Sequence, residues 1–410
     1  PRDKDNPHGE DFLTIKIEQV RWLVAGLKIR WHLIAVDDGC PAEPPSAEVA
    51  KQILQTRDPA DEDQNGRVTV LNLQEVVEGR IEASVSVLLS NKLSGLGSTG
   101  ESRKGGSILY GLAHALACRR SSDSHVVLYT DADLSANLAQ AGLLAAPILS
   151  GKAKAVAGQR YGVKDAVLVK DDRVSHEPES TTSKPDSTIV LLRQYFRSRL
   201  LPDIADIADT QAGFKAFSAS ALRTVIKEVA SLDESFDVEL LVRFTQRFSG
   251  RRARPIVLAP IVFVEDFGLT NFPSVGPQQR HLDMINQLVS LHCRLMPNSQ
   301  SETSDVRKLV GWLQQLSLPG YVAIVEYLER TGRIGLRVNR TDSTRPLFDP
   351  DWSVAELQAA ARTTVRTKDD QPKVVSVDWR PVALSSCSSY LRSTGDLASY
   401  WQKSQQASVI

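Results

Sequence analysis

The chain has 410 residues and carries 49 Lys and Arg against 49 Asp and Glu, so its formal net charge is zero. This balance gives no electrostatic reason to expect nucleic-acid or membrane-surface binding. No apolar run reaches the roughly 18 residues of a transmembrane helix, and the four cysteines are scattered without a CxxC pair or a signal peptide. We therefore expect a reduced, cytoplasmic protein with no transmembrane segment.

Helical and strand patterns alternate along the first two thirds of the chain. Apolar spacing predicts helices over 11–27, 107–116, 135–149 and 188–200, and strands over 31–36, 67–73, 81–89, 125–130, 153–158 and 255–265. This alternation predicts an α/β fold, in which ligands bind at the carboxyl ends of the strands. Residues 162–186 lack periodicity and are predicted to form a surface loop.

Two carboxylates, Asp131 and Asp133, come directly after the apolar run 125–130. Hard oxygen ligands on one tight turn suit Mg²⁺ or Mn²⁺, which take their remaining ligands from water and substrate phosphates. The pattern therefore predicts a site for a metal-diphosphate. The alternative is that either aspartate caps the helix expected to begin near Ser135.

Two further stretches place polar groups where a nucleotide would bind. Asp37 and Asp38 follow the strand 31–36 and can accept hydrogen bonds from a ribose or a base. The same residues are also typical of a solvated turn with no ligand. Lys104, Gly105 and Gly106 precede the helix predicted from residue 107. Glycines allow close approach to a ligand, and the helix amino terminus and the lysine favour an anion.

The later stretches add charged groups at the same expected edge. Arg160 follows the strand 153–158, and residues 209–217 read as a site loop that leads into a strand. Asp237 and Glu239 open the next helix, where they can act as charge complements of its amino terminus and nothing more.

Taken in order, these stretches resemble the family 2 glycosyltransferases of the GT-A fold, most nearly the dolichyl-phosphate glucosyltransferase and polyprenyl-phosphate glycosyltransferase branch. The resemblance covers about residues 1–268 and is most specific in the string DTQAGFK at 209–215. It implies a Rossmann-like, nucleotide-binding mixed sheet flanked by helices. The other matching motifs are DDG at 37–39, KGG at 104–106, DAD at 131–133, GQR at 158–160 and FDVE at 236–239.

The resemblance also implies roles for single residues. On the donor side, Asp38 with Asp37 beside it contacts the nucleotide, and Lys104 and Gly105 face the diphosphate.

The resemblance further implies that Asp131 and Asp133 hold the metal. Asp209 and Gln211 lie on the acceptor or sugar side, and Asp237 and Glu239 are near the reacting centre.

The chain departs from the family in two respects. The family opens with a strand ending in a Pro-x-x-Asn-Glu turn, to which only residues 1–3 can correspond, and the chain begins without Met, so we expect it to be a fragment. The nearest relatives also have membrane segments, which this sequence lacks. A soluble acceptor is therefore favoured over a polyprenyl phosphate.

The rest of the chain carries no recognisable motif. Residues 269–303 are predicted to be a linker and a helix at 278–296, and residues 304–410 an α-rich extension with helices at 306–316, 321–330 and 354–365 and an extended segment at 373–384. The extension is expected to pack on the catalytic domain or to form a homodimer contact.

The predicted reaction is metal-dependent, inverting transfer of a sugar from a UDP-linked donor to a hydroxyl or phosphate acceptor. Arg160 and Lys104 would stabilise the departing diphosphate. For a hydroxyl acceptor, Asp209 is the first candidate for the general base, followed by Asp237 or Glu239. The alternatives are a sugar-nucleotide nucleotidyltransferase and a non-catalytic module that binds nucleotide sugars.

Overall fold

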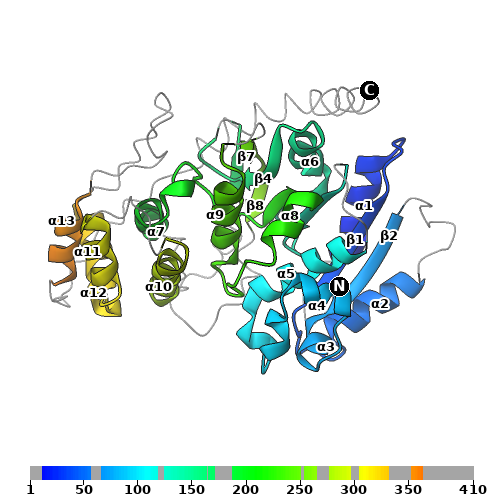
Figure 1. Ribbon diagram of the computed structural model, residues 1–410, viewed down its shortest axis with the longest axis horizontal. Coiled ribbons are helices and arrows are strands. Elements are labelled where there is room, and N and C mark those ends of the chain that lie inside the picture. Colours follow the sequence, from blue (N-terminus) through cyan, green and yellow to red (C-terminus); the bar gives the residue numbers. More distant parts are fainter. Residues whose placement is uncertain are drawn as a thin grey trace, which may run out of the picture. The chain divides into compact units, whose positions relative to one another are not determined.

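The computed structural model describes residues 12–56, 66–118, 124–163, 165–170, 187–250, 254–265, 277–296, 304–331 and 352–362 (Figure 1). These residues fall into two compact units. The first holds the described residues up to 170 together with 209–265, and the second holds 187–208 and the described residues from 277 onward. The sequence-based division at 268 assigned 187–208 to the first domain, whereas the structure groups them with the later helices.

The first unit is mixed α/β, as the sequence predicts. Its helices are α1 (Phe12–Val24), α2 (Ser46–Thr56), α3 (Leu73–Val77), α4 (Ala83–Leu88), α5 (Arg103–Ala117), α6 (Ala141–Leu149), α8 (Ala219–Val225) and α9 (Phe236–Phe248). Its strands are β1 (Trp31–Asp37), β2 (Gly66–Asn72), β3 (Val126–Thr130), β4 (Ala153–Gln159), β5 (Val167–Lys170), β6 (Phe214–Ser218), β7 (Arg254–Pro260) and β8 (Val262–Glu265).

A four-stranded sheet of order β3-β6-β4-β7 lies at the centre of this unit. Strand β6 runs antiparallel to both of its neighbours, and β4 and β7 are parallel. Thr130 at the end of β3 therefore pairs with Phe214 at the start of β6. This topology brings the carboxyl ends of β3 and β4 and the amino end of β6 to one edge, where the DAD, GQR and DTQAGFK motifs meet.

Two pairs of parallel strands accompany this sheet. β1 pairs with β2, and β5 pairs with β8. The single strand predicted over 255–265 is in fact two strands, because the chain changes partner at Ile261, which bonds to Gln159 on one side and to Val167 on the other. The predicted loop 162–186 was likewise wrong in part, since it contains β5; residues 171–186 lie outside the described ranges.

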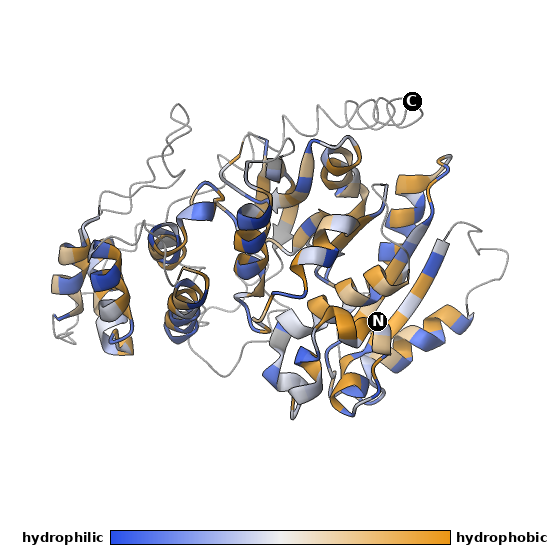
Figure 2. Cartoon of the chain, in the orientation of Figure 1, coloured by the Kyte–Doolittle hydropathy of each residue, from blue (hydrophilic) through white to orange (hydrophobic). Residues whose placement is uncertain are grey.

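Alternating side chains of the sheet build two apolar layers. Val127, Tyr129 and Phe217 pack with residues of α5, α8 and α9 on one face. Leu128, Phe214 and other residues of opposite parity pack with α6 on the other face. The surface helices carry apolar and polar residues in alternation, as α2 shows in Figure 2. The sheet is thus covered on both sides, and its polar edge is left for the site.

Three local predictions were wrong for an identifiable reason. Residues 81–89 were expected as a strand, but Val85, Leu88 and Leu89 are buried at helical spacing, and α4 forms there. Helix α5 begins at Arg103 rather than at residue 107. The helix expected from residue 135 begins at Ala141, after a short 3₁₀ turn.

The second unit is helical in its described part. Its helices are α7 (Ser187–Leu200), α10 (Pro277–Leu295), α11 (Ser304–Leu313), α12 (Leu318–Arg330) and α13 (Val354–Ala361). The hydroxyl of Tyr195 donates to the carbonyl of Trp352 at 2.7 Å, and Phe196 meets Trp312 edge to face. Aromatic contacts therefore join α7 to α11 and to Trp352, which precedes α13 in the predicted extension; the segment 373–384 lies outside the described ranges.

Among the helices that the structure describes, none combines the length and apolar character needed to span a bilayer.

Candidate functional site

Asp131 lies at the carboxyl end of β3, against the loop that precedes β6. Its backbone N–H donates to the carbonyl of Gly213 at 3.0 Å. A Cβ atom on Gly213 would lie 2.2 Å from Oδ2 of Asp131, closer than atoms can approach. Gly213 therefore leaves the space that the Asp131 carboxylate occupies, and the structure brings the DAD and DTQAGFK motifs into direct contact.

Lys104 reaches the same carboxylate from α5. Its ammonium forms an ion pair with Oδ1 of Asp131, and the two side chains are 47% and 19% exposed. Burial lowers the pKa of Lys104, but the charge and hydrogen bond of Asp131, with smaller effects of Asp237 and Asp133, raise it overall. Two of the predicted site residues are thus brought together in an open ion pair.

Asp133 is not a helix cap, but one of its carboxylate oxygens has a local structural role. Its Oδ1 accepts the N–H of Ser135 at 3.0 Å, which closes a local turn. The helical segment starts later, and its first turn is capped by Asn137, whose side chain accepts from Ala139 at 2.8 Å. Asp133 is partly exposed beside Asp131 in the turn.

Lys16 is a residue near this turn that sequence reasoning missed. It is 5% exposed on α1, and its ammonium donates to the carbonyl of Ala136 at 2.8 Å. Burial lowers its pKa to about 8, although the nearby charges of Asp133 and Asp131 act in the opposite direction. A single lysine between Ile15 and Ile17 in the amphipathic helix was the available signal.

The carboxylates of Asp131 and Asp133 fit a hard divalent cation. Both are partly exposed, and Oδ1 of Asp131 is buried against the Lys104 ammonium. Mg²⁺ typically takes one or two protein carboxylates and completes its shell with water and phosphate oxygens. Within the described ranges no group of three or more His, Cys, Asp or Glu is arranged to hold a metal. These two aspartates therefore suit a cation that arrives with a phosphate ligand, rather than a closed protein cage.

Arg160 and Asp209 meet in a closed ion pair. Nε and Nη2 of Arg160 donate to Oδ2 and Oδ1 of Asp209 at 2.7 and 3.0 Å, and the backbone N–H of Arg160 donates as well. Gln159 bonds to both backbone polar groups of Asp209. Burial raises the pKa of Asp209, but Arg160 outweighs this effect and lowers it overall. Asp209 is fully buried and is poorly placed to accept a proton from a substrate.

The loop 230–235 is organised by the predicted residues Gln211 and Glu239. Nε2 of Gln211 donates to the carbonyl of Glu234 at 3.2 Å. Glu239 accepts the N–H groups of Ala230 and Ser231 and pairs with Arg243 at 2.8 Å. Glu239 is fully buried, so its observed contacts are those of a residue that holds a loop.

Gly105 also contacts this loop. We expected it in a loop in front of a helix, where it would let a ligand approach. Instead it lies in the first turn of α5, and a Cβ there would come within 2.3 Å of the carbonyl oxygen of Leu232. The N–H of Gly106 donates to the same oxygen at 3.1 Å. Gly105 lets α5 approach the protein's own backbone closely, which positions Lys104.

Asp237 belongs to a buried polar network beneath the site. The ammonium of Lys215 lies 3.2 Å from its Oδ1 and donates to the carbonyl of Ala212 at 2.6 Å. The hydroxyl of Tyr129 donates to the same carboxylate oxygen. Burial raises the pKa of Asp237 more than Lys215 and Tyr129 lower it. Lys215 and Tyr129 were given no role from the sequence, although a lysine in a buried strand needs a partner.

Asp37 and Asp38 differ in what they contact. Oδ1 of Asp37 accepts the N–H groups of Gly39 and Cys40 at 2.7 and 2.8 Å, and Oδ2 accepts that of Ala47. Asp37 thus joins the turn after β1 to the start of α2. Asp38 is exposed beside it and remains a candidate for a nucleotide contact.

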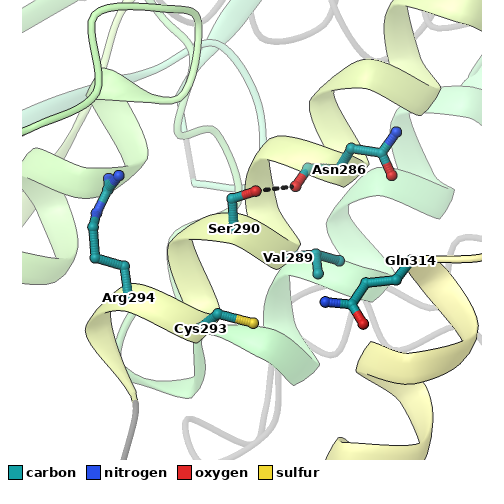
Figure 3. Close-up of a pocket in the computed structure, with 6 residues that line it drawn as sticks. All are labelled: Asn286, Val289, Ser290, Cys293, Arg294 and Gln314. Atoms are coloured by element: carbon teal, nitrogen blue, oxygen red, sulfur yellow. Dashed lines mark hydrogen bonds between the residues drawn. The ribbon is translucent and has the colours of Figure 1, made fainter.

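A separate hollow of about 590 Å³ lies in the second unit (Figure 3). It is formed along α10 and by Gln314 after α11, and Ser290 donates to the carbonyl of Asn286 at 3.0 Å within it. None of the predicted site residues lines this hollow.

The chain matches no protein-family model and no curated protein.

Proposed function

We propose that the first unit is a GT-A-like domain that transfers a sugar from a nucleotide-sugar donor, with UDP as the nucleotide. The observation that carries the proposal is the meeting of Asp131, Lys104 and Gly213 at one polar edge, with Asp133 in the same turn. Two partly exposed carboxylates beside a lysine suit a metal-bound diphosphate. The exposed Asp38 is the proposed nucleotide contact.

Each residue at the edge has a distinct task in this proposal. A Mg²⁺ or Mn²⁺ ion at Asp131 and Asp133 would supply Lewis-acid stabilisation of the departing diphosphate. Lys104, whose side chain is about half exposed, adds a positive charge. Arg160 acts indirectly, because its guanidinium is committed to Asp209 and holds the loop that carries Gly213.

For a hydroxyl acceptor, we propose Asp237 as the general base in preference to Asp209 and Glu239. The side chain of Asp237 retains 6% exposure, whereas those of Asp209 and Glu239 have none. Its pKa is raised, and a base with a raised pKa takes a proton more readily near neutral pH. Asp209 has the opposite shift. The acceptor is proposed to be soluble and the protein cytoplasmic, with the extension as a homodimer contact.

A thermal-shift screen tests the donor assignment, because a ligand that binds the native state raises the melting temperature. The protein is heated with UDP, other nucleotides and UDP-sugars, each with and without Mn²⁺. We expect the largest shift with a UDP ligand and Mn²⁺ together, accompanied by slow hydrolysis of the UDP-sugar. Pyrophosphate exchange would instead indicate a nucleotidyltransferase, and binding without turnover a binding module.

The metal assignment is tested by replacing Asp133 with Ala. This variant should keep its fold and lose metal-dependent turnover of the UDP-sugar. The matched control is Asp305→Ala, since this carboxylate is 87% exposed in the second unit. Undiminished turnover in Asp133→Ala would contradict the assignment.

A further inference from the structure

We propose that Lys104 and the divalent cation compete for the carboxylate of Asp131, so that the cation binds this edge weakly until a diphosphate draws the lysine away. The inference rests on the proposed function for the identity of the diphosphate. The competition itself rests on the ion pair between Lys104 and Oδ1 of Asp131.

The carboxylate is the fixed member of this pair. All three atoms of the Asp131 carboxylate lie 2.2–2.3 Å from the position that a Cβ of Gly213 would take, so the group rests against the glycine backbone. The N–H of Asp131 is also bonded to Gly213 at 3.0 Å. A cation that binds Asp131 must therefore come to the place where the carboxylate already lies.

Lys104 is the movable member. Its side chain is 47% exposed and has a flexible stem that carries a compact charge. Its backbone is held, because the adjacent Gly105 and Gly106 lie against Leu232. The ammonium can therefore leave Asp131 without displacing α5.

Charge explains why the exchange needs a diphosphate. Lys16 already places a second ammonium near Asp131 and Asp133. A divalent cation that entered beside both lysines would face two like charges and only two carboxylates. A diphosphate adds negative charge that pairs with the released Lys104 and shares the cation. Binding of the cation and binding of the nucleotide should then favour each other, and this coupling is reciprocal.

The test measures Mn²⁺ binding itself, from the electron paramagnetic resonance signal of free Mn²⁺ during titration, with no turnover required. The wild-type chain, Lys104→Gln and Lys16→Gln are compared without nucleotide, and circular dichroism checks that each is folded. We expect Lys104→Gln to bind Mn²⁺ roughly tenfold more tightly than the wild type, which corresponds to ~1.4 kcal/mol. When Asp131→Asn is added to Lys104→Gln, the double variant should lose this gain in Mn²⁺ affinity.

Lys16→Gln is the control for the general electric field. It removes one positive charge that acts on the same carboxylates, but its ammonium bonds to the Ala136 carbonyl rather than to Asp131. Its gain should be clearly smaller than that of Lys104→Gln. Lys104→Arg is a second control, because it keeps the charge and the ability to pair, and it should show no gain. Equal gains in the two Gln variants, or none in Lys104→Gln, would overturn the competition.

Repeating the titrations with UDP separates this inference from the proposed function. UDP should increase Mn²⁺ affinity in the wild type, and by a smaller factor in Lys104→Gln, because the lysine no longer has to be displaced. An equal increase in both proteins would overturn the role of the diphosphate. If UDP does not bind at all, the proposed function fails, while the competition is still decided by the nucleotide-free titrations.

Discussion

Two cation–carboxylate pairs lie at the same edge of the central sheet and differ in almost every physical respect. Arg160 and Asp209 form a two-pronged contact in which the carboxylate is fully buried and bonded to further N–H groups. Lys104 and Asp131 form a single contact in which the lysine is about half exposed. The first pair is suited to hold a loop and the second to exchange its partner. Acidic residues in neighbouring motifs therefore need not share a role, and burial distinguishes them.

The largest effect should come from breaking the closed pair. Asp209→Asn leaves the Arg160 guanidinium without its buried counter-charge, and loss of one member of such a pair typically costs about 3–5 kcal/mol. Asp131→Asn should cost less, because Lys104 is about half exposed and its ammonium can be hydrated once the carboxylate charge is gone. Urea unfolding of the two variants measures both values. Equal losses would remove the distinction between the pairs.

Breaking the buried network below the site should have the next largest effect. Lys215→Met leaves the Asp237 carboxylate without its ammonium, for which we expect a loss of about 3 kcal/mol in the free energy of unfolding. Adding Asp237→Asn removes the stranded charge, so the double variant should be more stable than the sum of the single losses by about 1 kcal/mol or more. Strict additivity would show that the two groups do not interact.

A smaller effect is expected where the open pair meets the backbone. Gly213→Ala forces a methyl group onto the Asp131 carboxylate, and overpacking of this type costs about 1–3 kcal/mol. The control is Gly311→Ala in α11, where nothing lies within 4 Å of the added Cβ. That change should stabilise the helix by roughly 0.5–1 kcal/mol. Melting temperatures that shift in the same direction would contradict this account.

The smallest effect should be a difference in pH dependence between two buried aspartates. The folded-state pKa of Asp209 is lowered, so its contribution is present above the ordinary carboxyl pKa and is lost as the pH falls below it. The folded-state pKa of Asp237 is raised above the ordinary carboxyl pKa, so the folded state keeps its proton to a higher pH than the unfolded state does. The free energy of unfolding therefore decreases as the pH rises from the ordinary pKa to the raised one. The free energies of unfolding of the wild type and of Asp237→Asn, measured from pH 3 upward, should differ increasingly over this pH range. Parallel curves would contradict the raised pKa.

Local patterns predicted most of the elements because they depend on near neighbours in the chain. Alternation and helical spacing identified α1, β1, β3 and α7 to within a few residues. The same reasoning failed at α4, where a short apolar run fits either a helix or a strand. It also missed the division of β7 from β8, because a change of strand partner at Ile261 leaves no mark on the apolar pattern.

The sequence alone determined which residue types follow the strands and open α5, and therefore which chemistry the edge can offer: carboxylates at Asp131 and Asp133, and positive charges at Lys104 and Arg160. Only the tertiary structure decided how those charges are paired. The antiparallel β6 brings Gly213 under Asp131 and Asp209 beside Arg160, although more than 45 residues of chain separate each pair. Burial and pairing depend on groups distant in the chain, and these two quantities distinguish an aspartate that can bind a cation from one that holds a loop.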